Sequence, residues 1–167
     1  MNIKLVKSVN VKDFKPIFEG LIDDFGYIYY HAILSWCGII DRRKEKFWEV
    51  WLIKWDNETI GICGLYSQRK GDVSELWLGW FGILPDYRNC GLGAKVLGLM
   101  EKKAAKLGCE RIYSYVDADG APLPFYYRNG FKRVCSVKTY LKKNRDLTME
   151  DFESADDHVI MKQIKTT

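Results

Sequence analysis

The sequence predicts an α/β domain in which a mixed sheet of six or seven strands carries about four helices on its faces. Two observations predict it: short alternating or apolar strand-like segments recur along the chain, and amphipathic helical segments interrupt them. The chain has 167 residues, of which 47% are hydrophobic and 29% are charged. This composition favours one globular domain over residues 1–167 and excludes a disordered, collagen-like or coiled-coil protein.

The N-terminal half shows strand patterns interrupted by one helical pattern. The helical segment repeats Phe and Ile every three or four positions up to Gly26, which favours a helix end. The turn Asp56-Asn57-Glu58 favours a hairpin, and Pro85 ends the last strand. In chain order, the pattern predicts a strand at 3–9, a helix at 11–25, helix and loop at 27–46, and strands at 47–55, 59–66 and 74–84.

The clearest helix follows, with an apolar stripe that includes Leu92, Val96 and Met100. Gly108 favours its end, and the prolines at 122 and 124 set the start of a short second helix, because proline fits only in a first helical turn. The C-terminal half is therefore predicted to contain a helix at 91–107, a strand at 111–116, a short helix at 122–128, a strand at 131–141, an acidic stretch at 150–157 and a last strand at 159–164.

Charge and cysteine usage argue against several classes of protein. The net charge of +4 is spread along the chain, whereas nucleic-acid binders usually concentrate basic residues in one patch. No Cys-x-x-Cys occurs and the two histidines lie far apart, so we expect reduced cysteines and no metal site. No signal peptide or membrane-length apolar segment is visible, so we expect a cytoplasmic protein that binds no membrane. The cysteines are Cys37, Cys63, Cys90, Cys109 and Cys135.

The most informative segment joins the strand at 74–84 to the helix at 91–107. A helix N-terminus has unpaired N–H groups, and glycines there let an anion approach without meeting a Cβ atom. The Walker pattern fails because Leu99 and Met100 follow Gly98, and the dinucleotide-binding pattern fails because Val96 stands where a third glycine is needed. By itself such a turn is more often structural. The segment reads Arg88-Asn89-Cys90-Gly91-Leu92-Gly93-Ala94.

A second motif follows, and the two together resemble the GNAT superfamily of acyl-CoA-dependent N-acetyltransferases. The family pattern (Val/Ile)-x-Pro-x-x-Arg/Gln-x-x-Gly-x-Gly/Ala is matched from Ile83 to Gly93, and the end of its later Phe-Tyr-x-x-x-Gly-Phe pattern from Phe125 to Phe131. Motifs cover about residues 76–131, and element order covers the rest. The resemblance implies acetyl-CoA as co-substrate and no metal.

The resemblance also implies roles for single residues. Tyr126 matches the tyrosine that protonates the departing CoA thiolate in many members, with Tyr127 and Tyr115 as fallbacks and a packed core ring as the alternative. Asp119 and Pro122 depart from the family's Asn and Ala, which puts the contact of residue 119 with pantetheine in doubt. Phe81, Gly82 and Ile83 match the strand that pairs with the pantetheine arm. Arg88, Asn89, Cys90, Gly91, Leu92, Gly93 and Ala94 match the loop that holds the CoA pyrophosphate.

An acceptor amine must lose a proton before it attacks, which costs a lysine-like amine about 4–5 kcal/mol near pH 7. Glu75 is the candidate general base, because members with a base often place a glutamate in this strand. Trp77 occupies the place of that glutamate in some members, so an exposed strand-end carboxylate at 75 and a water relay remain alternatives. The acceptor is expected near residues 25–36 and 140–158. There, Tyr27, Tyr29, Tyr30 and Trp36 either line a pocket or pack in the core, and Asp23 and Asp24 could attract a cation.

These observations predict transfer of an acetyl group from acetyl-CoA to a primary amine of a small molecule or peptide, by direct attack in a ternary complex. We expect a monomer or homodimer. Two alternatives stay open: a GNAT fold that binds acyl-CoA without transfer, and a nucleic-acid-binding role supported only by the net charge and the aromatic residues.

Overall fold

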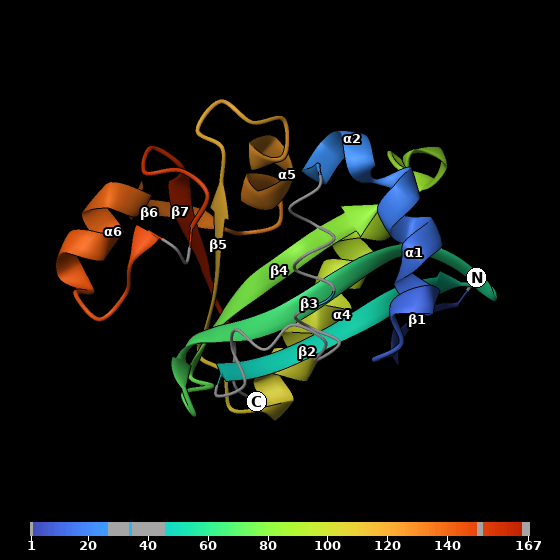
Figure 1. The fold of residues 1–167 in the computed structure, drawn as a ribbon, viewed down its shortest axis with the longest axis horizontal. Coiled ribbons are helices and arrows are strands. Elements are labelled where there is room, and N and C mark those ends of the chain that lie inside the picture. Colours follow the sequence, from blue (N-terminus) through green and yellow to red (C-terminus); the bar gives the residue numbers. More distant parts are fainter. Residues whose placement is uncertain (1, 27–33, 35–45, 150–151, 165–167) are drawn as a thin grey trace.

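The computed structural model describes residues 2–26, 34, 46–149 and 152–164. In this part of the chain, seven strands form one sheet in the order β1-β2-β3-β4-β5-β7-β6 (Figure 1). The pair β4–β5 is parallel and the other pairs are antiparallel, so the predicted mixed sheet is confirmed. The strands are β1 (Ile3–Lys7), β2 (Lys46–Trp55), β3 (Glu58–Lys70), β4 (Glu75–Ile83), β5 (Arg111–Val116), β6 (Lys132–Ser136) and β7 (His158–Gln163).

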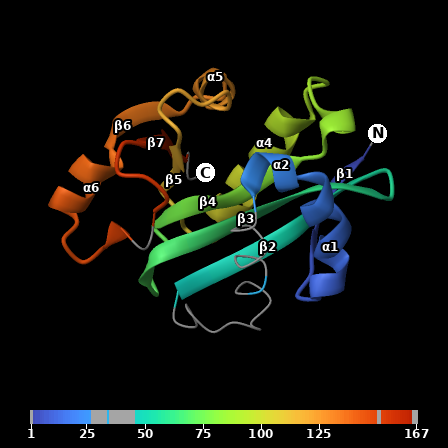
Figure 2. The ribbon, with the colours of Figure 1, turned by 45° about the horizontal axis from the view of Figure 1, so that its top comes forward.

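Helices cover both faces of this sheet. Helices α4 and α5 pack on one face, while α1 and α6 pack on the other (Figures 1 and 2). The segment predicted as helix and loop at 27–46 lies almost wholly outside the described residues. The described helices are α1 (Val11–Gly20), α2 (Ile22–Phe25), the 3₁₀ turn η1 (Pro85–Tyr87), α4 (Leu92–Lys106), α5 (Leu123–Arg128) and α6 (Val137–Lys143).

Strand alternation divides the core into two layers. On β2, Trp51 and Ile53 point to the α4 face, and Val50 and Leu52 point to α1. All four side chains are buried, so both faces of the central strands are covered, as their nearly continuous apolar sequence indicates. Lys103 of α4 adds a cation–π contact, with its Nζ 5.0 Å from the centre of the Trp51 ring.

A separate aromatic cluster fills the space between α6 and the sheet. The Trp77 ring stacks on Tyr113 at 5.2 Å between centroids and meets the edges of Tyr140 and Phe152 at 5.4 and 5.5 Å. Tyr66 completes the cluster at 6.5 Å from Trp77. The high aromatic content of the chain therefore serves in part to hold α6 and Phe152 against β3, β4 and β5.

Two predicted elements differ from the structure. The helix expected at 11–25 is interrupted at Leu21, which is fully buried and has φ −117° and ψ 9°. Gly20, just before it, packs against Leu84, where an added Cβ would lie 2.4 Å from that side chain. The predicted helix end at Gly26 is confirmed by its φ of 63°.

The strand expected at 131–141 is wrong in its second half. The strand ends at Ser136, whose side chain accepts a hydrogen bond from the Thr139 N–H and so caps α6. Val137 and Tyr140, three residues apart, are then both buried on one helical face. Ser136 is therefore the sequence signal for a helix start, and the strand-like pattern around it led to the wrong prediction.

The remaining elements agree with the predictions to within a few residues. β3 is longer than expected, because Tyr66 pairs with Trp48 and Lys70 pairs with Lys46 across the β2–β3 hairpin.

Of the helices that the structure describes, none is both long and apolar enough to cross a membrane.

Alanine substitution at two glycines should change the stability of the fold in opposite directions. A Cβ on Gly61 would lie 2.2 Å from the Gly82 carbonyl oxygen, whereas a Cβ on Gly98 in α4 would meet nothing within 4 Å. Gly61→Ala should lower the free energy of unfolding by about 1–3 kcal/mol through overpacking. Gly98→Ala should raise it by about 0.4–1 kcal/mol through helix propensity and unfolded-state entropy. Urea unfolding measures both, and equal stability of Gly61→Ala and wild type would contradict the close β3–β4 approach.

Candidate active site

β4 and β5 are paired only at their beginnings. Their ladder ends at Trp77 and Tyr113, yet β4 runs on to Ile83 and β5 to Val116. Both strands lie wholly within the described residues, and Figure 1 shows them diverging beyond the ladder. The unpaired backbone edge of a strand can bind an extended ligand by β-augmentation. The predicted pantetheine-binding residues Phe81, Gly82 and Ile83 lie on this part of β4.

A bulge lies in β4 beside the divergence. Ile62 of β3 pairs with Gly82, but Gly64 pairs with Gly79, so three steps on β4 oppose two on β3. Trp80 takes up the extra length with φ 45°, a left-handed conformation that is rare for a bulky residue. A bulge takes backbone groups out of the regular ladder and bends the strand, so it redirects β4 beside the point where it leaves β5.

The predicted phosphate loop lies at the N-terminus of α4. Gly91 is the N-cap of this helix, with φ 79° and no side-chain cap, and Asn89 is also left-handed with φ 61°. The first N–H groups of α4 are therefore open to an anion. Gly93 has a different reason to be glycine, because a Cβ there would lie 3.1 Å from the Phe125 ring of α5. Asn89, Cys90, Gly91 and Ala94 are exposed, Gly93 is half-buried, and Leu92 is buried in the core.

Tyr87 anchors this loop on the side of the β2–β3 hairpin. Its hydroxyl donates a 2.6 Å hydrogen bond to Glu58 Oε2, which raises the pKa of the phenol. Its ring also meets the edge of Trp55 at 5.7 Å. The turn that precedes the glycines is therefore held before any ligand binds.

Arg88 anchors the loop on its other side. Its Nε donates a 2.7 Å hydrogen bond to the carbonyl oxygen of Ile83, and both Nη atoms bond the carboxylate of Asp24 in α2. A contact of this guanidinium with phosphate would thus compete with an ion pair inside the protein.

Tyr126 lies in the core between α5 and the sheet. Its ring meets Phe125 and Phe131 edge to face at 5.2 and 5.4 Å, and the residue is 8% exposed. Burial raises the pKa of the phenol to about 12, although a hydrogen bond from the Ser114 hydroxyl of β5 opposes the shift. Tyr126 therefore faces β5, one residue beyond the last β4–β5 ladder pair.

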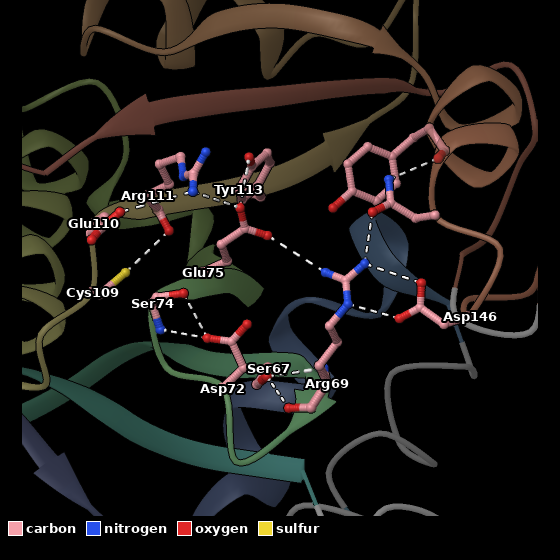
Figure 3. A network of polar contacts seen from close by, with 12 residues as sticks. Ser67, Arg69, Asp72, Ser74, Glu75, Cys109, Glu110, Arg111, Tyr113 and Asp146 are labelled. Atoms are coloured by element: carbon pink, nitrogen blue, oxygen red, sulfur yellow. Dashed lines mark hydrogen bonds and ion pairs between the residues drawn. The ribbon is translucent and has the colours of Figure 1, made fainter.

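Glu75 lies at the opposite end of β4, inside a polar network (Figure 3). Its carboxylate is 3.2 Å from Arg111 Nη2 and 3.6 Å from Arg69 Nη1, and it accepts a long hydrogen bond of 3.5 Å from the Tyr113 hydroxyl. The predicted base is thus held between two arginines at the closed end of the β4–β5 pair, and its side chain is 20% exposed.

Arg69 extends the same network to the chain after α6. Its Nε donates to Asp146 at 2.8 Å, and its Nη2 donates to Asn144 at 2.7 Å (Figure 3). The Arg69 hydrogen bond lowers the pKa of Asp146. Residues 144–146, part of the predicted acceptor region, are therefore fixed to β3.

The other predicted acceptor residues are only partly described. Tyr27, Tyr29, Tyr30 and Trp36 lie outside the described residues. Asp23 and Asp24 are exposed on α2, where Asp24 pairs with Arg88.

Carboxylates also gather where β5 ends and β7 begins. Val116 pairs with His158 there, next to Asp117 and Asp157. Burial, together with the nearby Asp117 and Asp156, raises the pKa of Asp157. Asp119 follows in an exposed turn, in which its N–H donates 3.1 Å to Asp117 Oδ1.

Sequence reasoning missed three features of this site. The bulge at Trp80 left a faint signal in Gly79 and Gly82, which flank it. The pair of Asp24 with Arg88 and the pairs of Glu75 join residues that are distant in sequence, and no local pattern reveals such contacts. No group of metal-ligating side chains occurs within the described ranges.

The buried phenol of Tyr126 predicts a loss of stability at alkaline pH. Its pKa is about 12 in the folded protein and about 10 in an unfolded chain, so the folded state holds the proton more tightly. The favourable contribution is complete below pH 10 and should decline by about 2 kcal/mol as pH rises to 12. Tyr126→Phe should lack this decline, whereas Tyr140, whose pKa is also about 12, contributes equally to both proteins.

Urea unfolding of wild type and Tyr126→Phe across this pH range measures the difference. The comparison near neutral pH is the control, because both rings are uncharged there. Parallel pH profiles in the two proteins would contradict the burial of this hydroxyl.

The chain matches the model of the acetyltransferase (GNAT) family over residues 13–131, more than half of its length. Among curated proteins none matches it by sequence. The match includes the diverging strands β4 and β5, the predicted phosphate loop and α5, whereas residues 144–146 and β7 lie beyond it.

Solved structures agree with this assignment. A GNAT family acetyltransferase from Staphylococcus aureus Mu50 has a TM-score of 0.67 at 15% identity, covering 98% of this chain and 100% of that one. A GNAT family acetyltransferase from Elizabethkingia anophelis with acetyl-CoA bound has a TM-score of 0.66 at 17% identity, covering 97% of both. The PaiA N-acetyltransferase from Thermoplasma acidophilum, in complex with coenzyme A, has a TM-score of 0.63 at 18% identity, covering 98% and 99%. The fold and the family match agree, and the chain belongs to the GNAT acetyltransferase family.

Proposed function

We propose that the protein is an N-acetyltransferase that moves an acetyl group from acetyl-CoA to a primary amine of a small molecule or peptide. The observation that carries this proposal is the unpaired edge of β4, which leads directly into the uncapped N-terminus of α4. An extended pantetheine arm with a pyrophosphate at its end matches such a strand edge followed by an anion site.

Most of the proposed cofactor contacts come from backbone groups, and one comes from a side chain. The edge of Phe81, Gly82 and Ile83 would pair with the pantetheine amides, and the N–H groups from Asn89 to Ala94 would hold the pyrophosphate. Asp119 is exposed near the end of β5 and can accept a hydrogen bond but cannot donate one as an asparagine does. Its contact is the least supported of the set. Acetyl-CoA supplies the activated acyl group.

Tyr126 is the proposed general acid. Because its pKa is about 12, the phenol is neutral at working pH and is available as a donor. A thiol has a pKa near 8.5, so hydrogen bonding from the phenol can stabilise the developing thiolate even before a proton moves. Donation from Ser114 would in turn stabilise charge on the phenol oxygen.

Glu75 is the proposed proton acceptor for the amine, either directly or through water. Its position between Arg69 and Arg111 keeps the carboxylate fixed but far along β4 from the bulge, which favours a water relay over direct contact. The carboxylates at the β5–β7 end, Asp117 and Asp157, would favour a cationic acceptor. We further propose that the enzyme acts in the cytoplasm, where reduced cysteines such as Cys63 and Cys109 persist.

Acetyl-CoA should stabilise the folded protein. At about 100 times the dissociation constant a ligand adds ~2.7 kcal/mol, which corresponds to a midpoint increase of several degrees at about 2–4 °C per kcal/mol. Gly91→Asp should lose most of this shift, because it places a carboxylate at the anion site. Gly93→Asp should lose it as well, because its Cβ would press on the Phe125 ring and displace the first turn of α4. Thermal unfolding with acetyl-CoA, CoA and ATP measures the effect.

Gly98→Ala, on the same helix but away from the loop, is the matched control and should keep the full shift. Absence of a shift with any acyl-CoA would overturn the proposed function. A shift without transfer to any amine of a broad panel would favour the alternative of a non-catalytic acyl-CoA-binding protein.

Tyr126→Phe and Glu75→Gln should slow transfer at different steps. Loss of a general acid or base typically costs about 10²–10⁴-fold in rate. Tyr126→Phe should lower kcat and leave acetyl-CoA binding intact, and the loss should be smaller with an acyl thioester whose thiol is more acidic. Glu75→Gln should lower the rate most near neutral pH and less at alkaline pH, where the amine is already deprotonated. Thiol release with an accepting amine measures both.

Tyr127→Phe is the control for the ring substitution, since Tyr127 is exposed on the same helix. Unchanged kcat in Tyr126→Phe would leave this residue with a packing role only. An equal loss at all pH values in Glu75→Gln, accompanied by lower stability, would assign the carboxylate to the Arg69–Arg111 network alone.

A further inference from the structure

The N-terminal helices are joined to the phosphate loop by one ion pair. Arg88 Nη1 lies 3.3 Å from Asp24 Oδ1, and Nη2 bonds the other carboxylate oxygen, so the contact is bidentate. The third donor, Nε, bonds the Ile83 carbonyl oxygen at 2.7 Å. These three contacts hold the guanidinium between α2 and the end of β4. Figure 1 shows α2 beside that end of the strand.

A second, apolar contact joins the same two parts. Gly20 at the end of α1 touches the Leu84 side chain so closely that an added Cβ would lie 2.4 Å from it. Leu84 also packs with Leu21 and Phe14 in the cluster under α1. The segment from Leu84 to Arg88 is thus fixed to α1 and α2 at both of its ends.

The charges explain why this pair matters for an anion site. Asp24 is a carboxylate beside the loop that is proposed to hold a pyrophosphate, and like charges repel. Its guanidinium partner neutralises it. The guanidinium is already bound on two sides within the protein, while the N–H groups of α4 remain open.

We propose that Arg88 is a positioning residue that shapes the phosphate loop and neutralises Asp24, rather than a ligand of the pyrophosphate, and that this pair couples α2 to binding of acetyl-CoA. The inference rests on the proposed function, since it concerns the same cofactor site. It assigns Asp24 a role in cofactor binding in place of the expected attraction of a cationic acceptor.

A double-mutant cycle on CoA binding separates the two roles of Arg88. Arg88→Gln should weaken CoA binding by about five- to tenfold, because it leaves Asp24 unpaired beside the anion. Adding Asp24→Asn should restore the affinity to within about threefold of wild type. Titration calorimetry with CoA measures all four proteins, after their folding has been checked by thermal unfolding.

A direct phosphate ligand behaves differently in this cycle. If Arg88 binds the pyrophosphate itself, the double variant stays as weak as Arg88→Gln, and this result overturns the proposal. Unchanged affinity in Arg88→Gln overturns it as well. Failure of wild type to bind CoA is a distinct result, because it removes the proposed function and, with it, this inference.

Amide hydrogen exchange tests the coupling to α2. The Asp24 N–H donates to the Leu21 carbonyl oxygen and the Gly26 N–H to that of Ile22, so both amides report on α2. CoA should slow their exchange in wild type and in Asp23→Asn, which removes the same charge one residue earlier and keeps the ion pair. CoA should not slow it in Asp24→Asn. Equal protection in Asp23→Asn and Asp24→Asn would show that the ion pair does not transmit binding.

Discussion

The loss of pairing between β4 and β5 is the constraint on which the rest of the site depends. Two parallel strands that start as neighbours and then separate leave backbone groups without partners, and such groups are costly to bury unless a ligand satisfies them. Below the divergence the Trp77–Tyr113 stack and the arginine pairs of Glu75 hold the strands together. Above it, α4 and α5 approach from one face and α2 lies beside the end of β4. The unpaired edge of β4 is therefore held open by the contacts below the divergence and by the helices above it.

The proposed phosphate loop is likewise held in place by contacts on both sides. Its glycines leave the first N–H groups of α4 free, while the residues before them are tied to neighbouring parts of the fold, Tyr87 to the β2–β3 hairpin and Arg88 to α2. A loop held in this way loses little entropy on binding a ligand. The charges of Glu58 and Asp24 are each satisfied within the protein, so they do not oppose an incoming anion. In the proposed complex, the backbone dipoles would attract the anion and the side chains would hold the loop in shape.

Much of the candidate site could be predicted from local sequence. The strand, the Pro85 turn, the glycine pair and the amphipathic helix follow one another within residues 74–107, so their local patterns predict the turn and the helix start that the structure has. The helix of Tyr126 is predicted in the same way, from the two prolines at 122 and 124. The prediction of a strand over the second half of 131–141 was wrong, because Val137 and Tyr140, three residues apart, fit a helical period and Ser136 caps the helix that contains them.

What the sequence determined by itself was the order of elements and the mixed sheet, because these depend on periodicity and on turn chemistry within short windows. In the same windows it predicted which residues would contact a cofactor. Only the tertiary structure decided which charges meet. Glu75 contacts arginines from β3 and β5, and Asp24 contacts an arginine sixty-four positions away. Such pairs depend on strand register and on helix docking, and a carboxylate in a sequence does not reveal whether it will face a substrate or another side chain. The bulge at Trp80 is of the same kind, since it arises from the mismatch between two strands and not from either one alone.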